Sequence, residues 1–389
     1  MTADRVPGLA EMVSDLRDRN VRRLHVLAWR DLDDPEAGGS EIHADAFMHR
    51  WQEAGLSILH RTSTARGHPA VGRRHGYDVV RRGGRLTVFP RVAISETMRR
   101  MGSFDALVEI WNGVPWMSPF WCRRPRLLVY HHVHGPMWDQ LFPRPVAALG
   151  RSIETRLAPP WYRSTPTVTL SKDSFDEMVA LGWMPDNLSI APAGVDPAFS
   201  PFGSRTLHPS VAAVGRLAPV KRFDVLIDQF AETRRRLPAA VLTIVGEGPE
   251  RSRLERRIAD LDAHHWIRLV GRVPFEDLLA LYRSSWLITS ASLTEGWGLT
   301  LTEAAGCGTP AVASDVPGHR SSVLADRTGT LVPVNQLGSA LADLLIDHER
   351  RTMMSDQAVQ WARSLSWDRL AEQVLHPLHR RIVATEPKR

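Results

Sequence analysis

The sequence has 389 residues, which at about 150 residues per domain accommodates roughly two to three domains. Apolar residues make up 43% and charged residues 24% of it, which excludes wholesale disorder and fibrous proteins. The net charge of +6 is weak support for a nucleic-acid partner, because proteins that bind nucleic acids usually cluster their basic residues.

The two cysteines, Cys122 and Cys307, cannot build a disulfide framework for a chain of this size. There is no apolar run of about 18 residues that would predict a membrane span, and residues 1–20 lack the apolar segment of a secretion signal. We therefore expect a cytoplasmic enzyme or binding protein. The basic residues are unevenly placed, because residues 61–126 contain 13 arginines and 4 acidic residues, a local charge of +9.

In the first half of the chain, short apolar runs alternate with amphipathic stretches, which is typical of β-α units and parallel sheets. A strand at 24–28 is followed by a polar loop and a helix over 41–54. Further elements are predicted after it, namely strands at 56–59, 86–89, 106–110, 127–130 and 167–170, and a helix at 171–181 with Ser171 as its N-cap.

The loop between the first strand and helix contains the sequence Gly38-Gly39-Ser40-Glu41. The glycine pair can bring backbone amides against phosphate or sugar oxygens. The structural alternative is that Ser40 is simply the N-cap of the helix. The same loop contains Asp31-Leu-Asp33, which matches the Asp-x-Asp form of metal-dependent sugar transferases. Three-residue matches arise often by chance, and we assign no metal to this one.

Three histidines, His131, His132 and His134, follow the strand at 127–130. A histidine at a strand end can position or deprotonate an acceptor hydroxyl. A zinc site would need a third or fourth ligand, and Cys122 does not complete the required spacing. Purely structural histidines are the other alternative here.

The stretch 191–210 is rich in Pro, Gly and Ser and is the predicted linker. The second half repeats the pattern of the first, with strands at 211–214, 241–245, 267–269, 286–290 and 311–313 and helices at 223–236, 250–260, 275–284 and 299–306. Two open sheets joined by one linker would place a ligand crevice between the domains, at the carboxyl ends of the strands.

Two cations, Arg216 and Lys221, lie between the strand at 211–214 and the helix at 223–236. An arginine can bind a diphosphate through two hydrogen bonds, and a lysine adds a point charge. Together they would neutralise a diphosphate leaving group without a metal ion. The spacing excludes a Walker A loop, and a surface basic turn is the structural alternative. The Gly246-Glu-Gly-Pro249 turn that follows the next strand is interpreted as structural.

The most informative segment is Thr294-Glu295-Gly-Trp-Gly-Leu-Thr-Leu-Thr-Glu303-Ala-Ala-Gly-Cys-Gly-Thr-Pro. A helix that starts near Gly298 offers unpaired backbone N–H groups to an anion. Two carboxylates, Glu295 and Glu303, are costly beside an anion unless they accept hydrogen bonds from hydroxyls. A nucleotide sugar supplies such hydroxyls from both its hexose and its ribose.

These motifs together resemble family 4 of the retaining glycosyltransferases. The resemblance rests on Gly215-Arg-Leu-x-Pro-x-Lys, Val245-Gly-Glu-Gly-Pro and the Glu295 segment, and it covers nearly the whole chain. It implies an α/β protein of GT-B architecture, with two Rossmann-like, doubly wound parallel-sheet domains facing an interdomain cleft. The implied domains are an acceptor-binding domain at 1–195, a donor-binding domain at 196–365, and a C-terminal helix within 366–389 that crosses back to the first domain.

The resemblance implies a metal-independent hexosyltransferase, with no cofactor, that uses a nucleotide-diphosphate sugar and retains the sugar's configuration. Glu295 would contact the transferred sugar. The histidine of the first domain corresponds to the His131–His134 run, where His132 and His134 are both candidate catalytic residues and His132 is favoured. The expected donor-binding residues are Gly39, Arg216, Lys221, Gly298, Leu299, Thr300 and Glu303. The expected partners are the donor and a hydroxyl acceptor, which is a glycan, a glycolipid or a small molecule.

The sequence departs from the family pattern in two places. Trp297 stands where phenylalanine is usual, and Pro317-Gly318-His319-Arg320 replaces a Gly-Gly pair with a downstream glutamate. We assign no role to that second segment. A nucleotide-sugar epimerase of the same fold and a non-catalytic nucleotide-binding subunit are the competing functions.

The nature of the acceptor depends on the first domain, which has Trp111, Trp116, Trp121 and Trp138 near basic residues. Aromatic and arginine side chains of this kind can lie at an anionic membrane surface, stack on a sugar, or form core packing. The first alternative would place the protein peripherally at the inner face of the plasma membrane.

Overall fold

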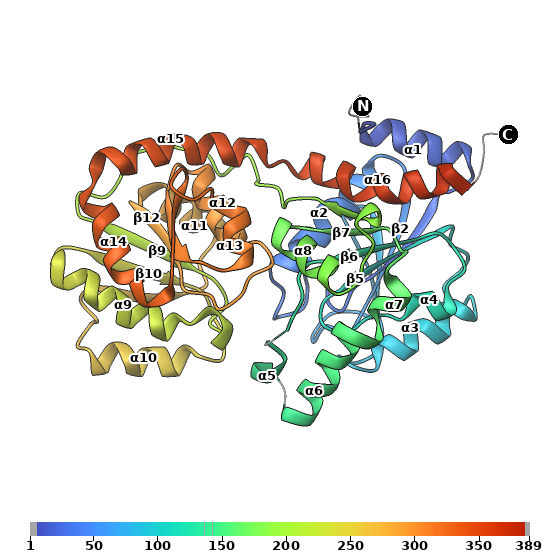
Figure 1. The fold of residues 1–389 in the computed structure, drawn as a ribbon, viewed down its shortest axis with the longest axis horizontal. Coiled ribbons are helices and arrows are strands. Elements are labelled where there is room, and N and C mark those ends of the chain that lie inside the picture. The colour runs from blue at the N-terminus through green and yellow to red at the C-terminus, as the bar shows by residue number, and fades with distance from the viewer. Residues whose placement is uncertain (1–5, 136, 142, 386–389) are drawn as a thin grey trace. The chain divides into compact units, whose positions relative to one another are not determined.

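The computed structural model describes residues 6–135, 137–141 and 143–385 (Figure 1). The chain divides into two compact units, Met1–Ala193 with Trp367–Arg389 and Gly194–Ser366, which we call the N-terminal and C-terminal units. The first boundary falls inside the stretch 191–210. The second lies just before the last helix, which therefore packs on the N-terminal unit.

The N-terminal unit is built on a sheet with the strand order β3-β4-β2-β1-β5-β6-β7-β8, in which all neighbours are parallel except the antiparallel pair β3 and β4. Its strands are β1 (Arg23–Leu27), β2 (Ser57–Thr62), β3 (Val71–Arg74), β4 (Tyr77–Arg81), β5 (Ala106–Trp111), β6 (Arg126–Tyr130), β7 (Thr167–Thr169) and β8 (Leu188–Ile190).

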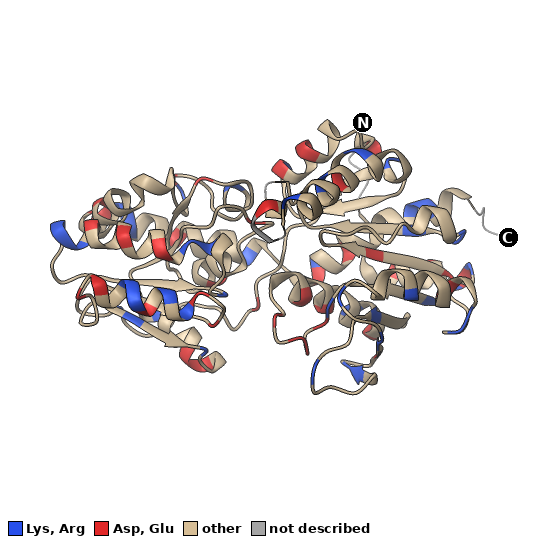
Figure 2. Cartoon of the chain, turned by 90° about the horizontal axis from the view of Figure 1, so that it is seen from below, with Lys and Arg blue, Asp and Glu red and all other residues tan. Residues whose placement is uncertain are grey.

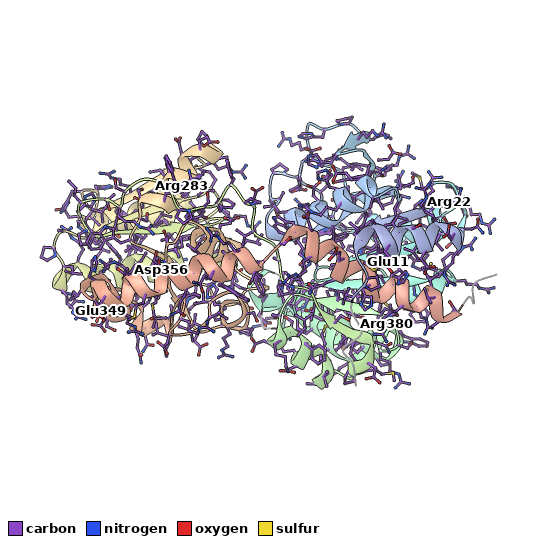
Figure 3. All side chains as sticks on the ribbon, turned by 90° about the horizontal axis from the view of Figure 1, so that it is seen from above. Glu11, Arg22, Arg283, Glu349, Asp356 and Arg380 are labelled. Atoms are coloured by element: carbon purple, nitrogen blue, oxygen red, sulfur yellow. The ribbon has the colours of Figure 1, made fainter. Side chains whose placement is uncertain are left out.

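Alternate residues of these strands face two cores. On β6, Leu127 and Val129 pack in the core beneath α1 (Leu9–Asp18), α2 (Gly39–Glu53) and α16 (Trp367–Thr385). Leu128 and Tyr130 face the opposite core. The helices that cover that opposite side are α3 (Val88–Thr97), α4 (Ser118–Trp121), α7 (Pro159–Tyr162) and α8 (Lys172–Ala180). Figure 3 shows α16 running alongside α1, with Glu11 and Arg380 labelled.

The remaining helical segments of the N-terminal unit connect these layers. They are α5 (Met137–Leu141), α6 (Arg144–Ser152), the π-helical turn η1 (Ile153–Leu157) and the short 3₁₀ turn η2 (Pro185–Asn187).

The C-terminal unit has an all-parallel sheet with the order β11-β10-β9-β12-β13-β14. This is a doubly wound order, in which successive strands are added on one side of β9 up to β11 and on the other side from β12 onward. The strands are β9 (Ser210–Val214), β10 (Val241–Val245), β11 (Ile267–Gly271), β12 (Leu287–Ser290), β13 (Ala311–Ser314) and β14 (Gly329–Val332).

Helices cover both faces of this second sheet. One core lies under α9 (Phe223–Arg236), α10 (Arg251–Asp260) and α14 (Leu337–Ile346), and the other under α11 (Phe275–Ser284) and α12 (Leu299–Gly306). The other segments are η3 (Pro219–Lys221), α13 (Pro317–Ser322), η4 (Val334–Gln336) and α15 (His348–Ser364). The predicted GT-B class, with two Rossmann-like parallel-sheet domains, is confirmed by these two sheets.

The predicted strands and helices are confirmed within a few residues, with one exception. Residues 86–89 were expected to form a strand, but they lead into helix α3. A four-residue apolar run cannot distinguish the two states. What the prediction missed is the recurrence of buried Val88, Val92 and Glu96 at intervals of four residues, the helical period.

The tryptophans near the basic residues are mostly core residues. Trp111, Trp116 and Trp138 are at most 5% exposed, and each indole N–H donates within the N-terminal unit. These three tryptophans are therefore core residues, which confirms the packing alternative. The alternative that they lie at a membrane surface is wrong for them. No helix of the described residues combines the length and the apolarity that crossing a bilayer requires.

The arginine surplus of residues 61–126 is partly neutralised by a loop that precedes it. Arg74, Arg81 and Arg85 pair with carboxylates of the segment 31–36. Figure 2 accordingly shows basic and acidic residues interspersed within each unit. The local charge of +9 therefore does not appear as a continuous basic surface.

Candidate active site

The loops after β9 and β12 hold the site of the C-terminal unit. These strands are neighbours at the point where the strand order reverses, which is where open α/β sheets bind ligands. The first loop carries Arg216 and Lys221, and the second carries Glu295. The backbone N–H of Leu293 donates to the carbonyl of Val220 at 2.9 Å, so the two loops are tied to each other.

Lys221 and Glu295 form an ion pair at the centre of this site. The hydroxyl of Ser292 also donates to Glu295 Oε1, at 2.7 Å. Burial raises the pKa of Glu295, but the charges of Lys221 and His319 and these hydrogen bonds outweigh it and hold the pKa at about 2. Glu295 is therefore an anion at neutral pH, and it points at the lysine expected to bind the diphosphate.

Helix α13 supports Glu295 from behind, although no role was predicted for its sequence. A Cβ on Gly318 would lie 2.4 Å from the carbonyl oxygen of Glu295, so only glycine lets the two segments approach this closely. The ring of His319 is fully buried, and its Nδ1 lies 2.8 Å from the carbonyl of Ser314. Burial lowers the pKa of His319, and Nδ1 is the donor in this contact because a carbonyl oxygen can only accept.

The start of α12 supplies the amide groups of the site. Gly298 is the N-cap, with a φ of 97° that favours glycine, and Leu299 and Thr300 occupy the first turn. Gly298, Leu299 and Thr300 are partly exposed, so an anion can approach their N–H groups. Trp297 is buried at 4% exposure, as expected for a residue that only changes packing.

The turn of Gly246 and Gly248 fixes the loop that carries Arg216. A Cβ on Gly246 would lie 1.9 Å from the carbonyl oxygen of Gly215, and one on Gly248 would lie 2.4 Å from that of Leu217. The N–H of Leu217 donates to the carbonyl of Glu247 at 2.9 Å. This turn is therefore structural, as predicted, and Arg216 is exposed beside it.

Glu303 lies on the second turn of α12, where the hydroxyl of Tyr282 donates to its carboxylate at 2.9 Å. Burial raises the pKa of Glu303 to about 7, and the single hydrogen bond from Tyr282 only partly offsets this. Further hydrogen-bond donors, such as a pair of hydroxyl groups, would stabilise the ionised form of this carboxyl group.

In the N-terminal unit, Gly39 opens helix α2. The alternative that Ser40 is the N-cap is wrong, because the cap is Gly38 and Ser40 lies within the first turn. The carboxylate of Glu41, at the third helical position, reaches back to accept from the N–H of Gly38 at 2.7 Å and so orders this end. Ser40 Oγ instead accepts from Asn112 Nδ2 at 3.3 Å, which links this helix to the loop after β5.

The histidine loop after β6 is held by one carboxylate, Glu154 of η1, which is fully buried. Its oxygens accept four hydrogen bonds, from Tyr130 Oη at 2.8 Å, the N–H of His134 at 2.9 Å, the N–H of Gly135 at 3.1 Å and Trp138 Nε1 at 2.9 Å. Burial raises the pKa of Glu154, but these donors and the charge of His134 lower it to about 2. Glu154 is therefore a positioning group and a weak base.

The histidines of this loop differ in their surroundings. His131 is buried, its Nε2 lies 3.3 Å from Nδ1 of His43, and burial lowers its pKa to about 3. His134 is 8% exposed and lies against Glu154. His132 is more exposed than either and stacks on His134 with ring centroids 4.7 Å apart.

The carboxylates of Asp31 and Asp33 form ion pairs with arginine side chains. Arg81 bonds both carboxylates, and Arg74 bonds Asp33 as well. These two aspartates therefore serve as ion-pair partners within the unit. Among the described residues, no three His, Cys, Asp or Glu side chains are grouped so as to hold a metal ion.

Sequence reasoning missed several groups that shape the site, namely Ser292, Gly318, His319, Tyr282 and Glu154. Gly318, Tyr282 and Glu154 act through contacts between segments about 20 residues or more apart, whereas Ser292 and His319 contact residues three and five positions away. Only Gly318 and His319 carried a signal, because they fall where the sequence departs from the family pattern.

Comparison with known proteins adds a family match. Residues 199–361 match the model of the family described as glycosyl transferases group 1. Over 355 residues the chain is 27% identical to the GDP-mannose-dependent alpha-(1-6)-phosphatidylinositol monomannoside mannosyltransferase of Mycolicibacterium smegmatis. That alignment covers 84% of this chain and 91% of the relative.

A second relative matches more closely over a shorter stretch. The D-inositol 3-phosphate glycosyltransferase of Salinispora tropica is 39% identical over 178 residues, which is 42% of this chain and 37% of the relative's length. Among solved structures, the sucrose-phosphate synthase of Thermosynechococcus elongatus superposes with a TM-score of 0.77 at 20% identity. The superposition covers 94% of this chain and all of that one.

Proposed function

We propose that the chain, which has the GT-B fold, is a hexosyltransferase of the group 1 glycosyltransferases that retains the anomeric configuration and needs no metal ion. The observation that carries this proposal is the meeting of Lys221, Glu295 and the start of α12 at the strand-order reversal of the C-terminal unit. Cationic side chains and oriented amides there can stabilise charge that develops on a leaving diphosphate.

Each donor contact follows from the chemistry of the group. Arg216 and Lys221 bind the diphosphate, together with the amides of Leu299 and Thr300. Glu295, an anion with a pKa of about 2, accepts hydrogen bonds from hydroxyls of the hexose. Glu303 accepts from the two ribose hydroxyls, and Gly39 brings backbone close to the reacting sugar.

In the proposed reaction, the bond between the sugar C1 and the diphosphate oxygen breaks, and the acceptor hydroxyl oxygen bonds to C1 on the same face. The proton of that hydroxyl passes to the departing diphosphate oxygen. The low pKa of Glu154 supports this route, because that carboxylate is a poor base. His132 orients the acceptor hydroxyl.

The names of the two relatives guide the choice of substrates. One is a GDP-mannose-dependent enzyme that acts on a phosphatidylinositol monomannoside, and the other is an inositol phosphate glycosyltransferase. GDP-mannose is therefore the first donor to test, and inositol-containing phosphates and lipids are the first acceptors. Because these relatives are transferases, they do not support the epimerase alternative.

The test of this function uses the purified full chain with a panel of nucleotide sugars and these acceptors, in the presence of a chelator. We expect a donor-dependent glycoside whose anomeric proton signal in NMR matches that of the donor, and a thermal shift with the matching nucleoside diphosphate. An inverted product would overturn retention. Transfer only after metal addition would overturn metal independence, and an epimer formed without an acceptor would overturn the transferase assignment.

Donor binding is expected to weaken as the pH falls through the pKa of Glu303, which is about 7. Hydroxyl donors bind the ionised carboxylate, so protonation competes with them, and affinity drops about tenfold between about pH 8 and pH 6. Calorimetric titration with an intact nucleotide sugar measures this, because its diphosphate stays ionised over that range. Glu303→Gln is expected to remove the dependence, and His132→Asn is expected to keep it. An unchanged slope in Glu303→Gln would assign the titration to another group.

A further inference from the structure

An apolar surface lies open on the helical segment that follows the histidine loop. Val146, Leu149, Ile153, Leu157 and Trp161 recur at intervals of three or four residues along α6, η1 and α7, so they share one face. Ile153 is partly buried, and the other four are 48–59% exposed. We call these five residues the apolar stripe.

The stripe is extended by an aromatic contact with another helix. Phe120 of α4 is 55% exposed, and its ring centroid lies 4.5 Å from that of Trp161. The C-terminal ends of α4 and α7 are therefore side by side. A contiguous exposed apolar patch with two aromatic rings is unusual for a surface that faces only water.

Arginines flank this apolar surface. They are exposed, and none forms an ion pair with a carboxylate of the described residues; they are Arg123, Arg124, Arg144, Arg156 and Arg163. The segment 31–36 neutralises part of the arginine surplus of residues 61–126. Arg123 and Arg124, near the end of that stretch, have no such acidic partner among the described residues.

A cavity of about 340 Å³ lies between the chain segments that follow α4 and α7, the two helices that carry Phe120 and Trp161. Arg123, Arg124 and Arg126 line it from the chain that follows α4, Ser164 and Thr165 from the chain that follows α7, and Arg381 from α16. Among the described residues, the lining contains no carboxylate. We call it the arginine cavity.

Two donors buried at the arginine cavity have no hydrogen-bond partner, Thr165 Oγ1 and Arg126 Nε. Thr165 is only 3% exposed, so leaving its hydroxyl unpaired costs free energy. An anion with several acceptor oxygens in the cavity would accept hydrogen bonds from the guanidinium groups that line it. The lining therefore fits a phosphate group.

The arginine cavity is separate from the candidate acceptor loop. It opens where β6 and β7 begin, whereas the histidine loop follows the end of β6. The five residues of β6 span about 17 Å at the usual rise of a strand. The cavity therefore serves a purpose other than holding the reacting hydroxyl.

We propose that the apolar stripe and the arginine cavity dock the N-terminal unit on a membrane that contains anionic phospholipid, with a lipid phosphate in the cavity. Trp161, Phe120 and the leucines enter the interfacial region, and the unpaired arginines meet the negative surface. The apolar residues beside the cavity favour a lipid headgroup over a free phosphate, because dissolved phosphate would not explain them. Docking does not depend on the proposed transfer.

The test is co-sedimentation of the full chain, without nucleotide sugar, with vesicles of phosphatidylcholine alone or mixed with phosphatidylglycerol. Wild type is expected to bind only the mixed vesicles, and more weakly as salt is raised. Arg123→Ala with Arg124→Ala is expected to lower the partition coefficient about tenfold or more. Trp161→Ala is expected to lower it about tenfold.

Matched controls lie on the C-terminal unit. Leu207→Ala removes a fully exposed apolar side chain, and Arg235→Ala with Arg256→Ala removes two exposed arginines. Both are expected to bind as wild type does. Binding that is absent, or equal in all variants, overturns the proposal. Stabilisation by inorganic phosphate through Arg123 and Arg124 without vesicle binding would instead assign the cavity to a free anion. A dimer abolished by Trp161→Ala would assign the stripe to a second copy.

Discussion

Replacing Lys221 with alanine is expected to lower the turnover number about 100- to 1000-fold while the protein stays folded, the usual effect of removing one charge-stabilising donor. Lys221 pairs with Glu295 beside the start of α12, so it lies where the leaving diphosphate would gain charge. Steady-state kinetics with a saturating donor measure the loss.

Lys172→Ala is the matched control for this variant. Lys172 is the other lysine of the described residues, and it lies on the exposed side of α8, paired with Asp176. Its replacement should leave turnover unchanged. Near-normal turnover in Lys221→Ala would contradict the assigned role. Lost turnover together with a collapsed circular dichroism spectrum would instead mean that the pair with Glu295 holds the fold.

The C-terminal unit could be predicted well because its signals are local. Val241–Val245 is a largely apolar run followed by Gly246, and Leu299–Gly306 starts directly after Gly298; both agree in their limits with β10 and α12. The position of Arg216, Lys221 and Glu295 at neighbouring strand ends follows from parallel topology alone. Their roles toward a donor remain predictions.

The N-terminal unit was harder to predict, because its polar residues pair with residues that are distant along the chain. β3 and β4 carry several arginines and were missed, since the partners that neutralise Arg74 and Arg81 lie in the loop after β1. A count of charge along the chain cannot show which arginines are paired. It also could not show that Trp111 and Trp138 are buried while Trp161 is exposed.

Glu154 shows most clearly which site residues cannot be predicted from the sequence. No motif marks it, and its importance comes from four donors that converge on it from β6, the histidine loop and α5. We expect Glu154→Gln to lower the free energy of unfolding by about 3–5 kcal/mol, the usual cost of leaving buried charge-assisted contacts unmatched. The amide NH₂ would face two of those donors, whichever way the glutamine side chain turns.

The loss of unfolding free energy in Glu154→Gln should be smaller at acidic pH than at neutral pH. Because the pKa of Glu154 is about 2 in the folded chain and near the ordinary value of 4.5 in the unfolded chain, its ionised form stabilises the fold fully above about pH 4.5. That stabilisation disappears as the pH falls toward 2. The difference between wild type and Glu154→Gln in denaturant unfolding should therefore be largest at neutral pH and shrink in acid.

Glu11→Gln, an exposed change on α1, is the control and should behave as wild type at every pH. The histidine loop should lose its order in Glu154→Gln, so transfer should fall even where the variant is fully folded, with the loss in turnover larger than the loss in donor affinity. This follows because Glu154 orients the loop of His132, whereas donor binding is assigned to the C-terminal unit. A variant as stable and active as wild type would mean that the four hydrogen bonds are replaced without cost, and the loop would then owe its position to packing alone.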